Sequence, residues 1–301
     1  MRISIITPTL NRAHFLEEAV ESVRAQAQHG IEHLILDGGS TDGTLEQLAR
    51  HPHLRVVSEP DRGLYDAINK GLRLASGEIV GWLNSDDRFA PGAFAAVLAA
   101  FADPAVEAVS GTAEFFERVG ANDVAVRRTV GVEMRALNVR NLTLGTPAIN
   151  ARFFRRSFRE RVGECDLRYR IAADRDWLLR AALLTPREVV IDAPVYQYRQ
   201  HDDSLTLDRA GQNASRSRQE HLAIAEEYLR RSDLPPGARA ALRSWHTRES
   251  SSEVHAAALR LDWRALAANA RRGWRVDAAW PIACLRTGLR GLVERVKWLN
   301  R

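Results

Sequence analysis

Residues 80–87, Val-Gly-Trp-Leu-Asn-Ser-Asp-Asp, are an apolar run that ends in two adjacent carboxylates, Asp86 and Asp87. Such a run predicts a buried strand, and in open α/β sheets ligands bind outside the carboxyl ends of the strands. Neighbouring carboxylates repel each other unless a cation or hydrogen-bond donors compensate them, and oxygen ligands suit Mg²⁺ or Mn²⁺. Taken alone, the octet is better explained as the start of a turn before Pro91. The segments that precede it change that interpretation.

The first 87 residues alternate short apolar runs with amphipathic helical patterns. Asn11, a residue type favoured at helix N-caps, is predicted to cap the first helix. Strands that alternate with helices of this length predict a parallel, doubly wound sheet with right-handed crossovers. Strands are predicted at residues 3–7, 34–36, 54–57 and 79–83, and helices at 15–23 and 64–75.

Polar side chains follow three of these strands. Thr7 and Thr9 stand at the end of the first strand, Asp37 at the end of the second, and the pair 86–87 after the fourth. An Asp-Gly-Gly stretch such as 37–39 is by itself more often a plain turn. Because the carboxyl ends of parallel strands share one edge of the sheet, the three ends together predict a nucleotide site. In it a base and ribose pocket would lie beside a metal–diphosphate pocket.

Four segments of the chain, taken in order, resemble the inverting glycosyltransferases of family two. The segments are 4–12 (SIITPTLNR), 37–44 (DGGSTDGT), 59–71 (EPDRGLYDAINKG) and 83–87 (LNSDD). Their order and spacing make the resemblance specific, although each motif alone would be weak. It covers about two-thirds of the chain. The resemblance implies an α/β fold of the GT-A type, with a mostly parallel sheet, helices on both faces and an acceptor-binding half.

The resemblance also implies roles for residues on the donor side. Asp37 would accept a hydrogen bond from a uracil imide. The Asp-x-Asp motif of the family falls on residues 84–86, so Asn84 replaces its first carboxylate and could offer only a carbonyl oxygen to the ribose. The resemblance places Asn69 and Gly71 beside the donor sugar, but a polar helix face and a helix-interior glycine explain the two residues equally well. The other residues implied to contact the nucleotide are Thr7, Pro8, Thr9, Asn11, Ser85 and Arg199.

For the cofactor, the resemblance implies Mn²⁺ or Mg²⁺ bound chiefly by Asp86, with Asp87 next to it. Residues 196–204 resemble the family loop that closes over the diphosphate. This makes Arg199 and His201 candidates for phosphate or metal contact. A lone loop histidine is usually only solvated, so the two explanations of His201 are evenly balanced.

On the acceptor side, residues 146–149 and 152–156 resemble the strand and helix beside the family's acceptor cleft. A helix is predicted to begin at or just after Asp174, which would make this residue an N-cap. The position also matches the family's catalytic base, and the resemblance implies this role for Asp174, with Asp176 in support. Such a carboxylate would deprotonate an acceptor hydroxyl that attacks opposite the departing diphosphate.

Composition points to an intracellular enzyme. Cys165 and Cys284 are far apart in sequence and have no metal-ligand spacing, so no disulfide framework is expected. Met1 leads directly into the first predicted strand, which leaves no room for a signal peptide. No apolar run approaches the roughly 20 residues that span a bilayer. The expected location is the cytoplasm, with the inner face of the membrane as an alternative.

The chain changes character after residue 205. Residues 206–301 hold 18 Arg and Lys against 10 Asp and Glu, a balance of +8, whereas residues 1–205 carry −3. We therefore predict a catalytic domain at 1–205 and a basic, all-helical region at 206–301. Nucleic acid is not expected, because the arginines are spread and no recognition motif occurs. Helices are predicted at 219–231, 236–248, 253–260, 263–272 and 282–299.

The predicted helix at 282–299 combines an apolar stripe with basic residues beside it. Packing on the preceding helices, or a coiled-coil seam in a homodimer, explains the stripe better than contact with an anionic membrane surface does. Both explanations remain open.

Together these features predict transfer of a sugar from a nucleotide-activated donor, with UDP expected, to a saccharide or lipid-linked saccharide hydroxyl. The reaction would proceed with inversion and would serve cell-surface polysaccharide synthesis. One alternative is a sugar nucleotidyltransferase, but the first 30 residues lack the Gly-rich loop and lysine of such enzymes. Another is a non-catalytic module that binds nucleotide or glycan, which Asn84 favours and Asp174 opposes.

Overall fold

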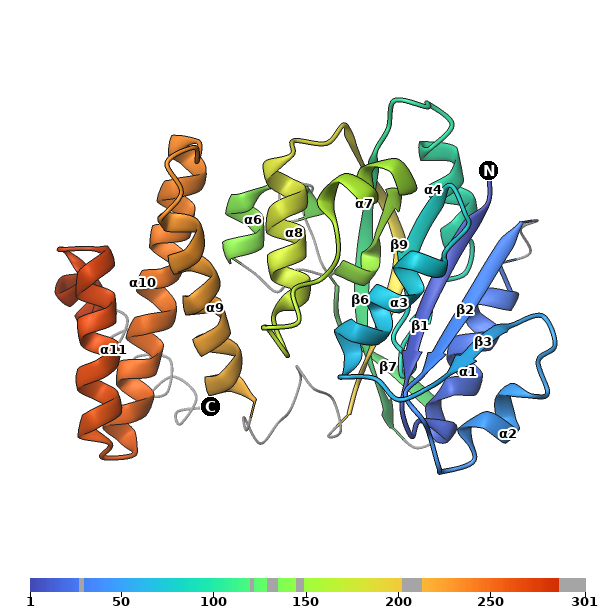
Figure 1. The fold of residues 1–301 in the computed structure, drawn as a ribbon, viewed down its shortest axis with the longest axis horizontal. Helices are drawn as coiled ribbons and strands as arrows, with labels where there is room; N and C mark the ends of the chain where they lie inside the picture. The colour runs from blue at the N-terminus through green and yellow to red at the C-terminus, as the bar shows by residue number, and fades with distance from the viewer. Residues whose placement is uncertain (27–29, 120–121, 129–134, 145–148, 202–212, 287–301) are drawn as a thin grey trace. The chain divides into compact units, whose positions relative to one another are not determined.

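The computed structural model of the chain describes residues 1–26, 30–119, 122–128, 135–144, 149–201 and 213–286. The chain divides into two compact units, Met1–Leu207 and Asp208–Arg301, which we call the N-terminal and the C-terminal unit. The N-terminal unit combines a sheet with helices, and the described part of the C-terminal unit is helical (Figure 1).

Nine strands among the described residues form one sheet, in the order β3-β2-β1-β4-β8-β6-β9-β5, with β7 paired to β6. Strands β3, β2, β1 and β4 are parallel, as are β6 and β9. The other pairings are antiparallel, so the sheet is parallel up to β4 and mixed beyond it. The bounds are β1 Ile3–Thr9, β2 Ile31–Asp37, β3 Arg55–Ser58, β4 Ile79–Trp82, β5 Arg88–Phe89, β6 Ala108–Val119, β7 Asn122–Arg128, β8 Arg152–Arg155 and β9 Glu188–Gln200.

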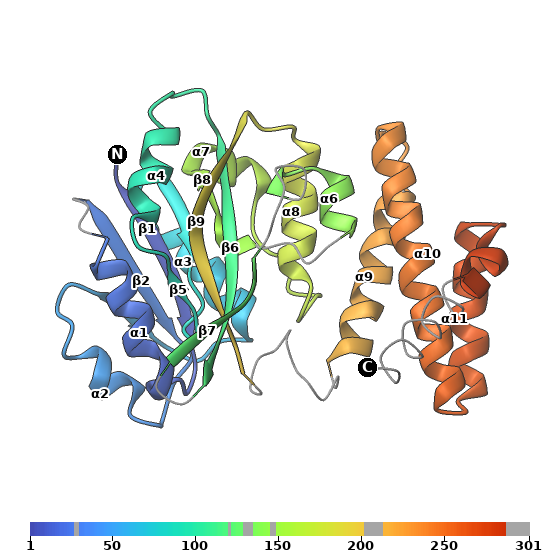
Figure 2. The same ribbon diagram turned by 180° about the vertical axis from the view of Figure 1, so that it is seen from behind.

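Helices cover both faces of the sheet, following the alternation of side chains along β1. Ile3 and Ile5 belong to the core shared with α1 and α4, whereas Ile6 faces α3. Gly71 of α3 permits this approach, because a Cβ at that position would collide with Ile6. Figures 1 and 2 show α3 and α1 on opposite sides of the sheet. The helices of this unit are α1 Ala13–Arg24, α2 Thr44–Leu48, α3 Leu64–Leu74, α4 Ala93–Ala100, α6 Val139–Leu144, α7 Arg156–Val162 and α8 Ala173–Leu183, with a 3₁₀ turn at Ile149–Ala151.

An aromatic cluster fixes α8 beside the end of β4. The rings of Trp82 and Trp177 meet edge to face with centroids 5.2 Å apart, and Phe154 of β8 lies 4.8 Å from Trp177. All three side chains are fully buried. Edge-to-face aromatic pairs contribute about 0.5–1.5 kcal/mol each beyond the burial of their area. The first turn of α8 is thereby held close to the loop that follows β4.

The start of α1 differs from the prediction. Its N-cap is Arg12, and Asn11 precedes it with a φ of 52°. The loop after β2 supplies the missing acceptors instead, because Asp42 Oδ2 accepts from the backbone N–H of Ala13 at 3.1 Å. The Asn11 side chain accepts from the Thr41 N–H at 2.9 Å. Asn11 therefore binds the neighbouring loop and does not cap its own helix.

The C-terminal unit contains α9 Ala214–Leu229, α10 Pro236–Leu259 and α11 Trp263–Val276. The two helices predicted at 236–248 and 253–260 are one continuous helix. The serines between them do not interrupt this helix, because their hydroxyls are satisfied within it. Ser250 Oγ donates to the His246 carbonyl at 2.8 Å, and Ser251 Oγ donates to the Thr247 carbonyl at 2.7 Å. Most of the helix predicted at 282–299 lies outside the described residues.

The structure also bears on two features predicted from composition, the state of the cysteines and the absence of a membrane-spanning run. Cys165 and Cys284 are both buried free thiols. Among the described residues, none of the helices has the length and apolar character needed to cross a membrane.

Candidate active site

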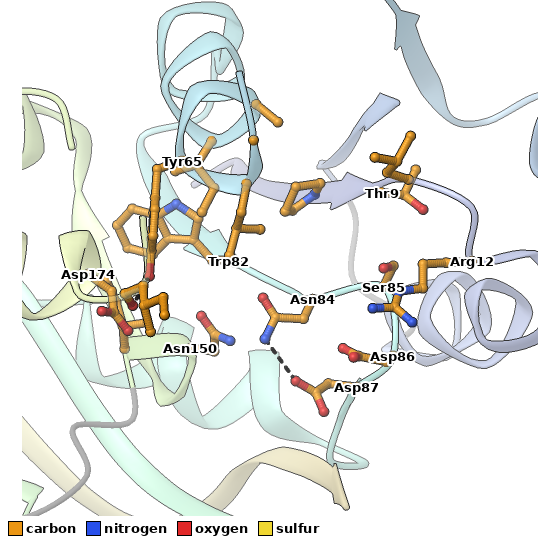
Figure 3. A pocket seen from close by; sticks show the side chains of 18 of the residues that line it. Thr9, Arg12, Tyr65, Trp82, Asn84, Ser85, Asp86, Asp87, Asn150 and Asp174 are labelled. Atoms are coloured by element: carbon orange, nitrogen blue, oxygen red, sulfur yellow. Dashed lines mark hydrogen bonds between the residues drawn. The ribbon is translucent and has the colours of Figure 1, made fainter. Parts of the chain in front are cut away.

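A pocket of about 350 Å³ lies at the carboxyl ends of β1 and β4, bordered by the starts of α3 and α8 and the end of β9. Figure 3 shows Tyr65 and Asp174 at one end of this pocket, and Asp86 and Asp87 at the other. Asn84 lies between the two ends. The predicted site residues on its wall are Pro8, Thr9, Asn84, Ser85, Asp86, Asp87, Asp174 and Arg199.

Asp87 is buried, and three protein donors hold its carboxylate. Tyr196 Oη and Asn84 Nδ2 donate to Oδ2 at 2.8 and 3.0 Å, and the Arg199 backbone N–H donates to Oδ1 at 2.8 Å. Burial, and after it the charge of Asp86, raise the pKa of Asp87 well above the usual value for aspartate. Because its acceptor positions are directed at the protein, Asp87 organises the loop between β4 and β5.

Asp86 is arranged differently, because its carboxylate meets a single side chain among the described residues. Asp86 Oδ2 lies 3.0 Å from His201 Nε2, just beyond the end of β9. The His201 ring packs on Phe15 with centroids 4.6 Å apart, and its Nδ1 is buried without a hydrogen-bond partner in the described part of the chain. A pocket-facing carboxylate with an adjacent imidazole is a donor set that fits a divalent cation.

Arg199 reaches the same end of the pocket, but its guanidinium is engaged within the protein. Nε donates to the Asp86 carbonyl oxygen at 3.0 Å, and Nη2 pairs with Glu18 at 2.5 Å. The Phe15 and Phe116 rings lie 5.3 and 4.8 Å from the guanidinium carbon. Arg199 therefore ties the Asp86 loop to α1 and β6. Its contact with a diphosphate stays a prediction.

Asp174 lies at the opposite end of the pocket, in the first turn of α8. The N-cap is Ala172, not Asp174 as predicted, because the Ala172 carbonyl already accepts from the Asp176 N–H at 3.1 Å. Asp174 Oδ1 accepts from the Arg175 N–H at 2.7 Å. Burial raises the pKa of Asp174 above the usual value for aspartate. A desolvated carboxylate on a pocket wall is a better proton acceptor than one in water.

Asp176 is buried and is not part of the pocket wall. Its carboxylate pairs with Arg180 Nε at 3.0 Å. Arg180 also donates to the carbonyl oxygens of Val162 and Glu164 at 2.5 and 2.6 Å. Asp176 thus holds the arginine that joins α8 to the end of α7.

Two residues predicted for the base pocket are engaged in the fold behind it. Thr7 is buried, and its Oγ1 lies 2.9 Å from His33 Nε2 on the neighbouring strand. Asp37 is also buried and accepts from the backbone N–H groups of Gly39 and Ser40, each at 3.1 Å. These bonds give the loop after β2 its shape, and neither Thr7 nor Asp37 lines the pocket.

Asn69 is a third predicted site residue that the fold uses elsewhere. Its Nδ2 donates to the Cys165 carbonyl at 2.9 Å, and its Oδ1 accepts from the Cys165 N–H at 2.8 Å. This paired bond joins α3 to the segment before α8. Asn69 lies neither on an exposed polar face nor on the wall of the pocket.

Two orphaned donors mark the inside of the pocket. Thr9 Oγ1 and Trp82 Nε1 are buried and have no hydrogen-bond partner within the described residues. Buried polar atoms are nearly always paired, so each indicates a place where a ligand or water binds. The sequence predicted Trp82 only as part of a strand. An apolar run does not show that the indole N–H of one of its residues faces a cavity.

Tyr196 is a residue that the prediction did not assign individually. Besides donating to Asp87, its hydroxyl accepts from the Asn84 N–H and from Asn150 Nδ2, both at 3.1 Å. The sequence contains little indication of this role, because the residues that Tyr196 contacts are far from it in the chain. Other pocket residues that were not assigned include Arg12, Asp61, Tyr65, Asn150 and Arg170.

Comparisons with known proteins agree on one family. The sequence model of glycosyl transferase family 2 matches residues 4–163. A protein of Mycobacterium tuberculosis named as an uncharacterized glycosyltransferase is 37% identical over 191 residues, which are 60% of this chain and 69% of that protein. A glycosyltransferase of PGL/p-HBAD biosynthesis from Mycobacterium bovis is 33% identical over 189 residues, 59% and 68% of the two chains.

Solved structures agree on the fold. TarS from S. aureus in complex with UDP has a TM-score of 0.67 at 19% identity, over 94% of this chain and 86% of that one. A mannosyltransferase from Pyrobaculum calidifontis in complex with GDP-Man and Mn²⁺ has a TM-score of 0.59 at 23% identity, over 96% and 87%. These likenesses confirm the predicted GT-A type α/β fold with a helical C-terminal region. With the match over residues 4–163, the chain is a glycosyltransferase that belongs to glycosyl transferase family 2.

Proposed function

We propose that the chain transfers a sugar from a UDP-activated donor to a hydroxyl of a saccharide or lipid-linked saccharide, with inversion, in the synthesis of a surface polysaccharide. The observation that carries the proposal is a single pocket with two unlike ends. Asp86 and its neighbour His201 mark one end, and the desolvated Asp174 marks the other. In an inverting transfer the leaving diphosphate and the attacking hydroxyl lie on opposite sides of the anomeric carbon. A pocket of this design suits that requirement.

Structural neighbours and sequence relatives support the choice of substrates. TarS was solved with UDP, and the mannosyltransferase with GDP-Man and Mn²⁺. The Mycobacterium bovis relative is named for PGL/p-HBAD biosynthesis. We infer by this likeness that a nucleotide sugar is the donor, that a divalent cation is used, and that the product is a glycolipid or polysaccharide.

Asp86 and His201 would hold the cation. When bound, Mn²⁺ or Mg²⁺ would neutralise the negative charge that grows on the leaving diphosphate. The imidazole favours Mn²⁺, because Mg²⁺ prefers oxygen ligands. Asp87 would support the cation site indirectly. Its carboxylate accepts from the Tyr196 hydroxyl and the Arg199 N–H, and these bonds fix the loop that carries Asp86.

Asp174 would take the proton from the acceptor hydroxyl, and Asp176 would keep α8 in place through Arg180. The base works only when it is ionised. Because burial raises the pKa of Asp174, we expect transfer to fall as the pH drops through that raised pKa. The acid limb of the rate profile would then lie at a higher pH than an ordinary aspartate gives.

The donor nucleotide would enter between the ends of β1 and β4. Pro8 and the unpaired Thr9 hydroxyl would meet the base, and Ser85 would lie beside the ribose. Asn84 Nδ2 is bound to Asp87, which leaves its carbonyl oxygen for a ribose hydroxyl (Figure 3). Asp37 would contact the uracil imide as part of the loop that it shapes.

The test is a panel of nucleotide sugars incubated with the full chain and Mn²⁺, with lipid-linked and free saccharides as acceptors. We expect release of UDP from at least one UDP-sugar, faster with acceptor than without it. NMR of the product should show the anomeric configuration opposite to that of the donor. A retained configuration would refute inversion. UDP binding without turnover of any donor would make the chain a binding module.

A further inference from the structure

The C-terminal unit contains a second hollow, formed where the end of α9 meets α10 and α11. Its volume is about 670 Å³, and α10 packs against both of the other helices (Figure 2). We call this hollow the arginine pocket, because six arginines line it, and Glu226 is the one acid on its wall among the described residues. The arginines are Arg230, Arg239, Arg243, Arg271, Arg272 and Arg275.

Two of the six arginines are engaged with the protein. Arg239 Nη1 donates to the Leu229 carbonyl at the end of α9, at 2.9 Å. Arg272 Nη2 bonds to Glu226 at 3.1 Å, and Glu226 is shared with His246 Nε2 at 3.0 Å. Against the effect of burial, the hydrogen bonds from His246 and Arg272 lower the pKa of Glu226 to about 2. The single acid of the pocket is thus already neutralised.

The guanidinium groups of the other four, Arg230, Arg243, Arg271 and Arg275, are exposed and have no hydrogen-bond or ion-pair partner in the described part of the chain. Acids are used elsewhere in this unit, where Glu253 pairs with Arg218 at 2.5 Å. Like charges gathered in one hollow repel each other and weaken the folded state unless an anion compensates them.

We propose that the arginine pocket binds a ligand that carries clustered phosphate groups, supplied either by a lipid head group or by a soluble diphosphate. Each guanidinium is a planar fork that can bind two phosphate oxygens, and four of them without a protein partner line this one hollow. The volume lies within the roughly 300–1,000 Å³ of small-ligand sites. The proposal is independent of the function proposed for the N-terminal unit, because the two pockets share no residue.

Two probes distinguish the two phosphate sources, both applied to the full chain. Calorimetry with inorganic pyrophosphate reports a soluble ligand. Flotation with phosphatidylcholine vesicles, with or without phosphatidic acid, reports a lipid head group. We expect binding to at least one phosphate source, weakening as salt rises because screening reduces the attraction.

The variant that removes the site is Arg230→Gln/Arg243→Gln/Arg271→Gln/Arg275→Gln. We expect it to bind at least about tenfold more weakly, which corresponds to about 1.4 kcal/mol, because the charge-assisted contacts to phosphate are lost. The matched control is Arg216→Gln/Arg260→Gln/Arg264→Gln/Arg286→Gln, which removes the same number of charges from four exposed arginines of the same unit that lie outside the pocket. Circular dichroism and UDP binding check that each variant is folded.

Loss in the quadruple variant with retention in the control would establish the site, and the probe that binds would name the source. If neither probe binds the wild-type chain, the proposal is wrong. An equal loss in control and quadruple variant would also overturn it, since net charge alone would then explain binding. Should the quadruple variant not fold, Arg271→Gln/Arg275→Gln replaces it, with Arg260→Gln/Arg264→Gln as its control of equal charge change. Weaker binding by this double variant alone would support the site, and binding equal to that of the control would overturn it.

Discussion

The two ends of the active-site pocket each present an aspartate whose pKa is raised by burial, yet the two carboxylates are held in different ways. At one end, Asp87 receives three hydrogen bonds from the Tyr196 hydroxyl, the Asn84 amide and the Arg199 backbone. At the other, Asp174 accepts from the Arg175 backbone N–H and meets the Tyr65 hydroxyl, and its side chain lines the pocket. The difference teaches how one residue type performs two tasks. Burial raises the pKa of both carboxylates, so the difference lies in their partners: three protein donors engage Asp87, whereas Asp174 has fewer and keeps acceptor capacity toward the pocket.

The largest expected difference between two substitutions is that between Asp86→Ala and Asp87→Ala, at the end of the pocket that contains both residues. Asp86→Ala should abolish metal-dependent turnover and the gain in UDP affinity that Mn²⁺ provides, because a bound cation contributes several kcal/mol of transition-state stabilisation. Calorimetry of UDP with and without Mn²⁺ measures it. Unchanged metal dependence in Asp86→Ala would contradict the assignment.

Asp87→Ala is the matched comparison, and it should damage folding more than metal binding. It leaves three buried donors without their acceptor, at a cost of about 1–3 kcal/mol for each group left unpaired. We expect a lower urea midpoint and a metal dependence of UDP binding that persists at temperatures where the variant is folded.

A second contrast concerns the acids near the base pocket. Asp37→Ala should weaken UDP binding by about 1–3 kcal/mol, through loss of the imide contact and of the bonds that shape its loop. Asp61 lines the pocket close by, where its carboxylate approaches the Gly38 backbone. If Asp61→Ala weakens UDP binding and Asp37→Ala leaves it unaltered, the imide acceptor is Asp61.

His33 is a buried basic residue behind the pocket, and its burial should make the stability of the fold depend on pH. Burial lowers the pKa of His33 to about 3, whereas an unfolded histidine titrates near 6.5. Between these values the unfolded chain binds more protons, so stability falls as the pH decreases from about 6.5. The cost is about 2 kcal/mol at pH 5. Urea unfolding at pH 7.5 and 5 should show this loss in the wild-type chain and not in His33→Gln; equal pH slopes would contradict it.

The smallest expected effect tests why the chain departs from the Asp-x-Asp motif. Asn84→Asp replaces a donor to Asp87 with a like charge, so we expect a loss of about 1 kcal/mol without metal. Mn²⁺ should recover part of the loss, because the added carboxylate can then face a cation. The measurement is the urea midpoint of unfolding, with and without Mn²⁺. If the midpoint of Asn84→Asp equals that of the wild type and Mn²⁺ does not change it, the Asn84–Asp87 hydrogen bond does not stabilise the fold.

The sequence predicted those parts of the site that depend on strand order. Pro8, Asn84 and Asp86 follow apolar runs, and parallel strands bring such ends to one edge. The predicted locations of the early strands and helices were close for the same reason, since side-chain periodicity is a local property. The start of α8 was misplaced, because Asp174 has the residue type of a cap while Ala172 supplies the capping carbonyl.

Other features depend on contacts that no local pattern contains. From its local pattern Asn69 is a residue on a polar helix face. In the structure its side-chain amide makes two hydrogen bonds to the backbone of Cys165, 96 positions away. Tyr196 joins Asp87 over a separation of 109 residues. The helices predicted at 236–248 and 253–260 are one helix, and the hydroxyls of Ser250 and Ser251 bond to carbonyls of its preceding turn.

The most direct test of the central claim compares Asp174→Asn with Asp176→Asn, measuring the transfer rate and UDP affinity on the same samples. Asparagine keeps the size of aspartate and removes its basicity, and general-base catalysis contributes about 10²–10⁴-fold to rate. We predict that Asp174→Asn loses transfer by about that factor while UDP affinity stays near the wild-type value. Asp176→Asn should lose less, because it acts through Arg180. Full activity of Asp174→Asn would contradict the account, and a dead Asp176→Asn beside it would move the base to Asp176.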